Sequence, residues 1–247
     1  MFSILEYFLN KFLSSCGIAS RRKCDDLIKN GKISINGKVV AELGTIINEK
    51  KDKVEFEGRI LELKNDFVYL KLHKPKGYIC SNADEKGRKT IFDIVQSDKR
   101  LFSIGRLDYN TEGLILLTND GDFAQIFSHP RNEIDKEYIV VIEGKILESE
   151  LAILRAGVVE NGIKMPKAKV DAIKYDGRTT RISVVIDEGQ NRQIRRMFEA
   201  IGRDIILLKR VRVGPISLGG LTRGTFKPLT KEEMGLIQEF NFTNSSI

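Results

Sequence analysis

The sequence predicts an α+β protein in two parts: a small N-terminal α/β module, then a larger domain around a mixed, largely antiparallel sheet. Helical and strand periodicities alternate along the chain. Several short turns, such as Asn36-Gly37, predict hairpins between neighbouring strands. The length of 247 residues suits one large domain or two smaller ones. We therefore expect a first part at 1–64, including a short charged linker that begins at residue 62, and a second part at 65–247.

The first part is predicted to hold two helices and a small sheet. Apolar residues recur at helical spacing up to about Ser15, at positions 5, 8, 9, 12, 13 and 16. Ser20 is typical of an N-cap, so a second helix is expected over 21–30, ended by Gly31. Alternation over 33–39 predicts a hairpin, and a further strand is expected at 53–56.

The second part reads as strands separated by helices. A continuous apolar run at 113–118 predicts a buried strand. Further strands are expected at 67–73, 137–143 and 180–187, and helices at 122–127, 147–157, 193–201 and 230–239. These elements justify a mixed sheet with helices packed on it.

The composition favours a polyanionic partner and excludes several kinds of enzyme. The net charge is +7 and the isoelectric point is about 9.2. The three Cys and two His have no metal-ligand spacing, so no metal site or Cys-His enzyme is expected. The chain has no apolar run of the roughly 18 residues that a membrane helix needs, and no signal peptide pattern, so a cytoplasmic location is expected.

Basic residues gather in the first part. They are Lys11, Arg21, Arg22, Lys23, Lys29 and Lys32. Three of them begin a predicted helix, where cations lie beside the positive end of the helix dipole and are unfavourable. A phosphate bound there would interact favourably with the dipole and with the three cations. They are candidate RNA contacts, and the alternative is a solvated helix end.

A polar loop at 103–113 leads directly into the buried strand and carries Asp108. Active-site carboxylates commonly lie on loops of this kind, which a rigid strand holds in position. Arg106 and Thr111 flank the carboxylate, and a cation and a hydroxyl would keep it ionised. The alternative is an ordinary turn residue.

Three further segments carry candidate site residues. Tyr138 opens a strand and could stack on an extruded base, or be a half-buried strand residue. Arg195 lies in a helix whose arginines could bind an anion or face solvent, and the basic residues at 203, 209, 210 and 212 are expected to extend this surface. Lys74 lies in the turn Lys-Pro-Lys-Gly, which could also be a solvated turn.

The order of these segments resembles the pseudouridine synthases of the RsuA/RluB type. Their signature is similar to Gly-Arg-Leu-Asp-x-x-Thr-x-Gly-Leu-x-x-Leu-Thr-Asn-Asp-Gly at 105–121. The turn at 74–77, the Lys-x-Tyr strand at 136–138 and the Gln-Ile-Arg-Arg-Met helix at 193–197 follow the order of that family. Residues 9–40 resemble the S4 RNA-binding domain, and the whole resemblance covers about residues 5–235.

The resemblance implies an enzyme that isomerises uridine in RNA to pseudouridine, without metal or organic cofactor. It implies that Asp108 is the nucleophile, that Arg195 pairs with it, and that Tyr138 stacks on the flipped uracil. Arg106, Ile194 and Lys74 are expected to bind substrate. Whether the carboxylate adds to the sugar or assists a glycal-type intermediate stays open.

The expected partner is ribosomal RNA or a ribosomal precursor particle, bound by a monomer. Large-subunit rRNA is preferred as the target, and a small-subunit target is the alternative. Two other classes stay open at this point. One is a non-catalytic S4-type rRNA-binding protein, and the other is a retaining glycosidic hydrolase, which would need two nearby carboxylates.

Overall fold

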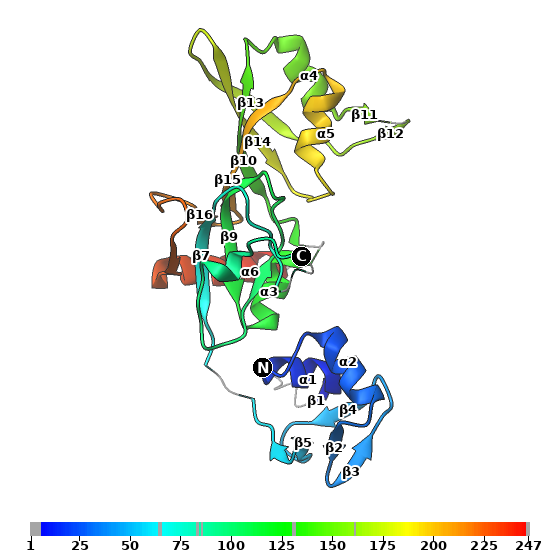
Figure 1. Ribbon diagram of the computed structural model, residues 1–247. Helices are drawn as coiled ribbons and strands as arrows, with labels where there is room; N and C mark the ends of the chain where they lie inside the picture. The colour runs from blue at the N-terminus through cyan, green and yellow to red at the C-terminus, as the bar shows by residue number, and fades with distance from the viewer. Residues whose placement is uncertain are drawn as a thin grey trace. The chain divides into compact units, whose positions relative to one another are not determined.

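A computed structural model gives the structure of residues 6–63, 66–82, 84, 86–129, 132–160 and 162–245 (Figure 1). The chain divides into two compact units. Unit 1 comprises Met1–Phe67 with the short pieces Asp98–Arg100 and Asn119–Gly121, and unit 2 comprises the remainder. Within the part of the chain that the structure describes, no helix has the length and apolar character needed to cross a membrane.

Unit 1 packs two helices with short strands. Helix α1 (Leu9–Ser15) buries Leu9, Phe12 and Leu13, and α2 (Arg21–Lys29) begins at the predicted cap, where the Ser20 hydroxyl accepts from the Lys23 amide. The sheet has the order β3-β2-β5-β6, with bounds Lys38–Val40, Ile33–Ile35, Val54–Phe56 and Arg59–Ile60. Strands β1 (Glu6–Phe8) and β4 (Ile46–Asn48) form a separate pair.

The hairpin prediction for unit 1 is confirmed, the expected start of the first helix is corrected, and one strand was not predicted. Asn36 and Gly37 have φ of 53° and 78°, as a tight hairpin turn requires. The first helix begins later than predicted because Phe8 belongs to β1 and is 53 % exposed; position 5 lies outside the described residues. Strand β4 was not predicted, because its three residues are too few to give a periodicity.

Unit 2 is built on a mixed sheet with the order β13-β14-β10-β15-β9-β7-β17. Strands β9 and β15 pair in parallel, and the other described ladders of this sheet are antiparallel, as predicted. The strand bounds are β7 Tyr69–Lys74, β9 Glu112–Thr118, β10 Lys136–Glu143, β13 Lys169–Tyr175, β14 Thr179–Ile186, β15 Ile205–Val213 and β17 Phe226–Pro228. Strands β8 (Phe102–Ile104) and β16 (Ile216–Ser217) pair with β9 and β15, and β11 (Val159–Glu160) pairs with β12 (Ile163–Lys164).

The helices of unit 2 cover different parts of this sheet (Figure 1). Helices α4 (Glu148–Ala156) and α5 (Gln193–Ala200) share a core with β10 and β14. Helices α3 (Gly121–Ser128) and α6 (Lys231–Ser245) share a second core with β9. Helix α5 matches its predicted range to within one residue, because its apolar face is regular and buried.

Gly113 lies where strand β9 pairs with strand β15. It has a φ of +117°, and a Cβ at this position would lie 2.1 Å from the Arg210 carbonyl oxygen. Only glycine therefore permits the close approach of β9 to β15. This approach places the end of the Asp108 loop beside the middle of β15.

Candidate active site

A cavity of about 610 Å³ opens in unit 2 where three elements meet. The loop between β8 and β9 contributes Asp108, strand β10 contributes Tyr138, and the beginning of α5 contributes Ile194. The structure thus brings together three residues that are far apart in the sequence. Among the described residues that line the cavity, Asp108 alone carries a carboxylate.

The loop that carries Asp108 is held through its backbone. Five consecutive carbonyls, from Leu107 to Thr111, accept hydrogen bonds from outside the loop. The donors, in order, are the Cys80 thiol at 3.5 Å, Lys74 Nζ at 3.0 Å, the Gly77 amide at 2.9 Å, Arg195 Nη2 at 2.9 Å and Lys74 Nζ again at 2.9 Å. The half-buried Asp108 carboxylate accepts no hydrogen bond from the described residues, so its oxygens are available for chemistry.

The expectation that Lys74 binds substrate is corrected. Its side chain is fully buried, and its ammonium donates to the carbonyls of Pro75, Asp108 and Thr111. All three donors are therefore used within the protein. Burial lowers the pKa of Lys74 to about 8, although the charges of Cys80 and Asp108 oppose the shift. Lys74 positions the loop and does not line the cavity.

Arg195 supports the same loop from α5. Its Nη2 donates to the Asn110 carbonyl and lies 3.5 Å from the Thr111 hydroxyl, while its buried Nε has no partner. Burial lowers the pKa of Arg195, and the nearby charge of Asp108 opposes that shift. Within the described residues the two charges attract through space without a direct ion pair.

Tyr138 and Ile194 form an apolar wall opposite the loop. They are 7 % and 4 % exposed and belong to one core cluster with Leu107 and Leu208. A register shift between Glu137 and Tyr138 marks an irregularity where Tyr138 enters the sheet. Arg106 is exposed, lines the cavity and has no hydrogen-bond partner among the described residues.

The cavity wall also holds polar residues that were not among the predicted site residues. Gln193 is 3 % exposed. Its side-chain Oε1 accepts a hydrogen bond from the backbone N–H of Gln190, and its Nε2 has no partner among the described residues. Lys136 and Arg210 also line the cavity. Lys136 begins the Lys-x-Tyr motif and Gln193 begins the Gln-Ile-Arg-Arg-Met motif, so these two residues could have been found from the sequence. Arg210 lies in β15, which was not predicted as a strand.

The expected basic surface at 203–212 is largely wrong. Arg210 is 3 % exposed, Arg203 pairs with Glu150 at 2.7 Å, and Arg212 lies 3.1 Å from a Glu137 carboxylate oxygen. Arg203 precedes β15, and a register shift lies between Arg210 and Arg212 within that strand, so the three side chains have different partners, which a count of charges does not reveal.

The basic residues predicted in unit 1 fall mostly on α2. Arg21, Arg22, Lys23 and Lys29 are exposed on this helix, and Lys32 is exposed before β2. Lys11, on α1, is partly buried, with its ammonium 5.6 Å from the centre of the Tyr7 ring.

Comparison with known families identifies both units. Residues 68–200 match the model of the RNA pseudouridylate synthase family, and residues 9–54 match the S4 domain. The chain belongs to the RNA pseudouridylate synthase family. It is thus an RNA pseudouridine synthase with an N-terminal S4 domain, and the predicted family and enzyme class are confirmed.

Relatives of this synthase are similar over nearly the whole of this chain. The ribosomal large subunit pseudouridine synthase B of Bacillus subtilis is 44 % identical over 229 residues, which cover 92 % of this chain and 93 % of the relative. The protein of the same name from Vibrio cholerae is 36 % identical, covering 94 % of this chain and 74 % of the relative. A crystal structure of a pseudouridylate synthase has a TM-score of 0.67 and 31 % identity, covering 93 % of this chain and 99 % of that one.

Proposed function

We propose that this synthase isomerises a uridine of large-subunit rRNA to pseudouridine, with Asp108 as the nucleophile. The observation that carries this proposal is the Asp108 loop: five carbonyls are fixed and the single carboxylate of the described cavity wall is left free. The large-subunit target is supported by the names of the two relatives described above. A retaining hydrolase would need a second carboxylate near the first, which the described wall does not supply.

The cavity suits a uridine that has left its helix. Tyr138 stacks on the extruded uracil and Ile194 packs beneath the ring, which excludes water from the reacting atoms. The Asp108 carboxylate then assists cleavage of the bond between N1 and C1′, either by adding to C1′ or by assisting a glycal-type intermediate. The uracil turns over and C5 bonds to C1′, which displaces the carboxylate in the first route and is accompanied by return of the proton to C2′ in the second. The C5 proton then leaves and N1 gains a proton. These steps need no metal or organic cofactor.

The cations have separate roles in this proposal. Arg195 and Lys74 hold the loop carbonyls, so the carboxylate is oriented before substrate arrives. Arg106, exposed at the rim, occupies the space in the RNA that the base vacates.

We further propose that the S4 domain docks the enzyme through phosphates. Helix α2 has exposed cations but no aromatic residue on which a base could stack. Its cations therefore bind the RNA backbone, and unit 2 selects the uridine. The substrate is rRNA or a ribosomal precursor particle in the cytoplasm. One chain supplies the described cavity wall, so we propose that the enzyme acts as a monomer. We also propose that the boundary between its two domains lies between residues 64 and 65.

The deciding experiment is site-resolved pseudouridine mapping of both rRNAs from cells with and without the gene. We expect one pseudouridine of the large subunit to disappear and to return with the wild-type gene, but not with Asp108→Asn. A site lost from the small subunit would replace the proposed target. Release of free uracil from RNA would indicate a hydrolase, and unchanged maps would overturn the function.

A further inference from the structure

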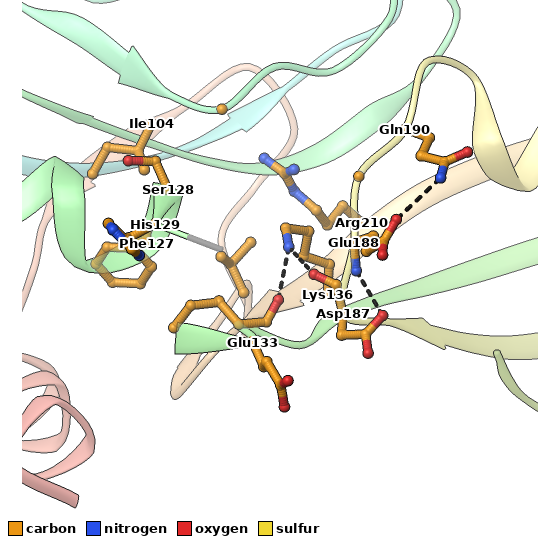
Figure 2. Close-up of a pocket in the computed structure, with 14 residues that line it drawn as sticks. Ile104, Phe127, Ser128, His129, Glu133, Lys136, Asp187, Glu188, Gln190 and Arg210 are labelled. Atoms are coloured by element: carbon orange, nitrogen blue, oxygen red, sulfur yellow. Dashed lines mark hydrogen bonds between the residues drawn. The ribbon is translucent and has the colours of Figure 1, made fainter. Parts of the chain in front are cut away.

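A second cavity of about 600 Å³ adjoins the active site, and Figure 2 shows the residues that line it. Its apolar part is made by Ile104, Phe127, Ile134 and Val213. It shares five lining residues with the active-site cavity, namely Gly105, Lys136, Gly189, Gln190 and Arg210. The two cavities are therefore neighbours separated by a common wall, and nothing in the mechanism above uses the second one.

The common wall carries two cations from neighbouring strands, Lys136 on β10 and Arg210 on β15 (Figure 2). Arg210 is 3 % exposed; its Nε donates to the Leu114 carbonyl at 2.8 Å, and its Nη2 is buried without a partner. Lys136 donates to the carbonyls of Ile134 and Asp187, both at 2.7 Å, so its ammonium keeps one further N–H.

This wall is electrostatically incomplete. Burial lowers the pKa of Lys136 and the charge of Arg210 adds to the shift, while the carboxylates of Asp187, Asp135 and Glu188 oppose it. A buried donor without a partner also costs free energy. An anion placed at the wall would accept from the free donors and relieve the repulsion between the two cations.

We infer that the second cavity binds the base of the nucleotide next to the target uridine, and that Lys136 and Arg210 bind the phosphate that joins the two nucleotides. The inference rests on the proposed function. In RNA, one phosphate lies between each pair of consecutive nucleosides, as the cationic wall lies between the two cavities. With the uracil beside Tyr138, the linking phosphate meets the wall and the neighbouring base enters the second cavity.

The chemistry of the second cavity suits a base and disfavours a phosphate. Three carboxylates, those of Glu133, Asp187 and Glu188, lie at its exposed rim and repel a further anion. Its apolar part includes the Phe127 ring, against which a flat base can pack. The cavity therefore binds a neutral aromatic ring, and the anion stays at the wall.

Filling the second cavity tests the base site. Ser128→Trp introduces a large side chain at an exposed lining position that is absent from the active-site wall, and Gln125→Trp is the matched control on the same helix, outside the cavity. The probes are synthetic fragments of the rRNA around the mapped uridine, either intact or abasic at the position before or after it. We expect Ser128→Trp to lower kcat/KM about tenfold on intact RNA, as the abasic change does for the wild type at one of the two positions.

The losses of kcat/KM caused by Ser128→Trp and by the abasic nucleotide should not add, because both changes remove the same contact between the base and the second cavity. Equal losses from Ser128→Trp on intact and abasic RNA, or no loss at all, would overturn the base site. A wild-type enzyme that forms no pseudouridine in any fragment or in the rRNA would instead overturn the proposed function, so the two failures are distinguishable.

Neutralising the linking phosphate tests the wall. A methylphosphonate on the same side of the target should lower the kcat/KM of the wild type about tenfold, because it removes the charge that Lys136 and Arg210 bind. Lys136→Gln should lose activity on normal RNA and lose less than about twofold further on the methylphosphonate. The same loss for both enzymes on the methylphosphonate would overturn phosphate binding by the wall.

Discussion

The Asp108 loop and the start of helix α2 are both polar segments with a proposed role toward RNA, yet they are built in opposite ways. Each carbonyl of the loop from Leu107 to Thr111 is fixed by a donor from elsewhere in unit 2. The cations at the start of α2 are exposed, and Arg21 makes only a long contact of 3.5 Å with Asn10. The contrast is between a fixed backbone and free side chains.

The difference follows from what each segment has to do. A nucleophile must meet one carbon atom, and a displacement of about 1 Å can cost about a hundredfold in rate. A cation that binds a phosphate gains from charge over several ångströms and tolerates motion. Changes in the loop should therefore alter kcat, whereas changes in α2 should alter affinity and its dependence on salt.

Asp108→Asn tests the fixed side of the comparison with the largest expected effect. Asparagine is similar in size but is not an anionic nucleophile, so pseudouridine formation should fall by at least about 10⁴-fold. The dissociation constant for RNA should stay within about twofold, because the carboxylate bonds no described residue. Retained activity would remove Asp108 as the nucleophile.

Lys74→Met asks whether the fixed carbonyls matter. It removes two hydrogen bonds to the loop and one to the Pro75 carbonyl while keeping an apolar stem, so kcat should fall about a hundredfold. Lys71→Met is the matched control on the same strand, because Lys71 pairs with Glu233 at 2.6 Å and not with the loop. Equal kcat values for the two variants, measured in single turnovers, would show that the loop keeps its conformation without the hydrogen bonds from Lys74.

Arg195→Ala removes one tie to the loop and one nearby positive charge. We expect kcat to fall about thirtyfold, as the loss of a charge-assisted hydrogen bond suggests, with little change in melting temperature. Arg196→Ala is the control, because Arg196 pairs with Glu160 instead of the loop. A collapse of the melting temperature in Arg195→Ala alone would assign Arg195 a structural role.

Replacing Arg21, Arg22 and Lys23 by Gln tests the exposed side of the comparison. RNA affinity should fall about tenfold, and the slope of log affinity against log salt should become less negative by about two units, with kcat unchanged at saturation. Replacing the exposed Lys50 and Lys51, which lie in a turn of the same unit, should alter the slope less. An identical slope in both variants would separate α2 from RNA binding.

The smallest expected effect is on the pH profile. Because the pKa of Lys74 is about 8, raising the pH through 8 removes one N–H and the positive charge from the group that donates to two loop carbonyls, and should lower kcat a few-fold. The unfolded chain retains that proton up to about pH 10.5. Folding therefore releases a proton between these values, and the free energy of unfolding should rise with pH there, relative to Lys74→Met. Parallel stability curves for the two proteins would contradict the assignment.

The comparison also explains what the sequence could predict. Helix α2, its Ser20 cap and the Asn36-Gly37 turn depend on neighbouring residues, so local patterns identified them. The roles of Lys74 and Arg210 depend on contacts made across the sheet, and neither was foreseen. Asp108, Tyr138 and Arg195 were identified from motifs, but the free carboxylate and the fixed carbonyls became visible only in three dimensions.

The ties of the Asp108 loop have a consequence for the protein during its own synthesis. Lys74 and Cys80 precede the loop, but Arg195 and Ile194 follow it by more than 80 residues. A nascent chain can form the core of unit 1 early, because that core uses only the first part of the chain. The wall that orients Asp108 exists only after α5 has left the ribosome. An enzyme proposed to modify rRNA thus completes the wall around its nucleophile only late in its own synthesis.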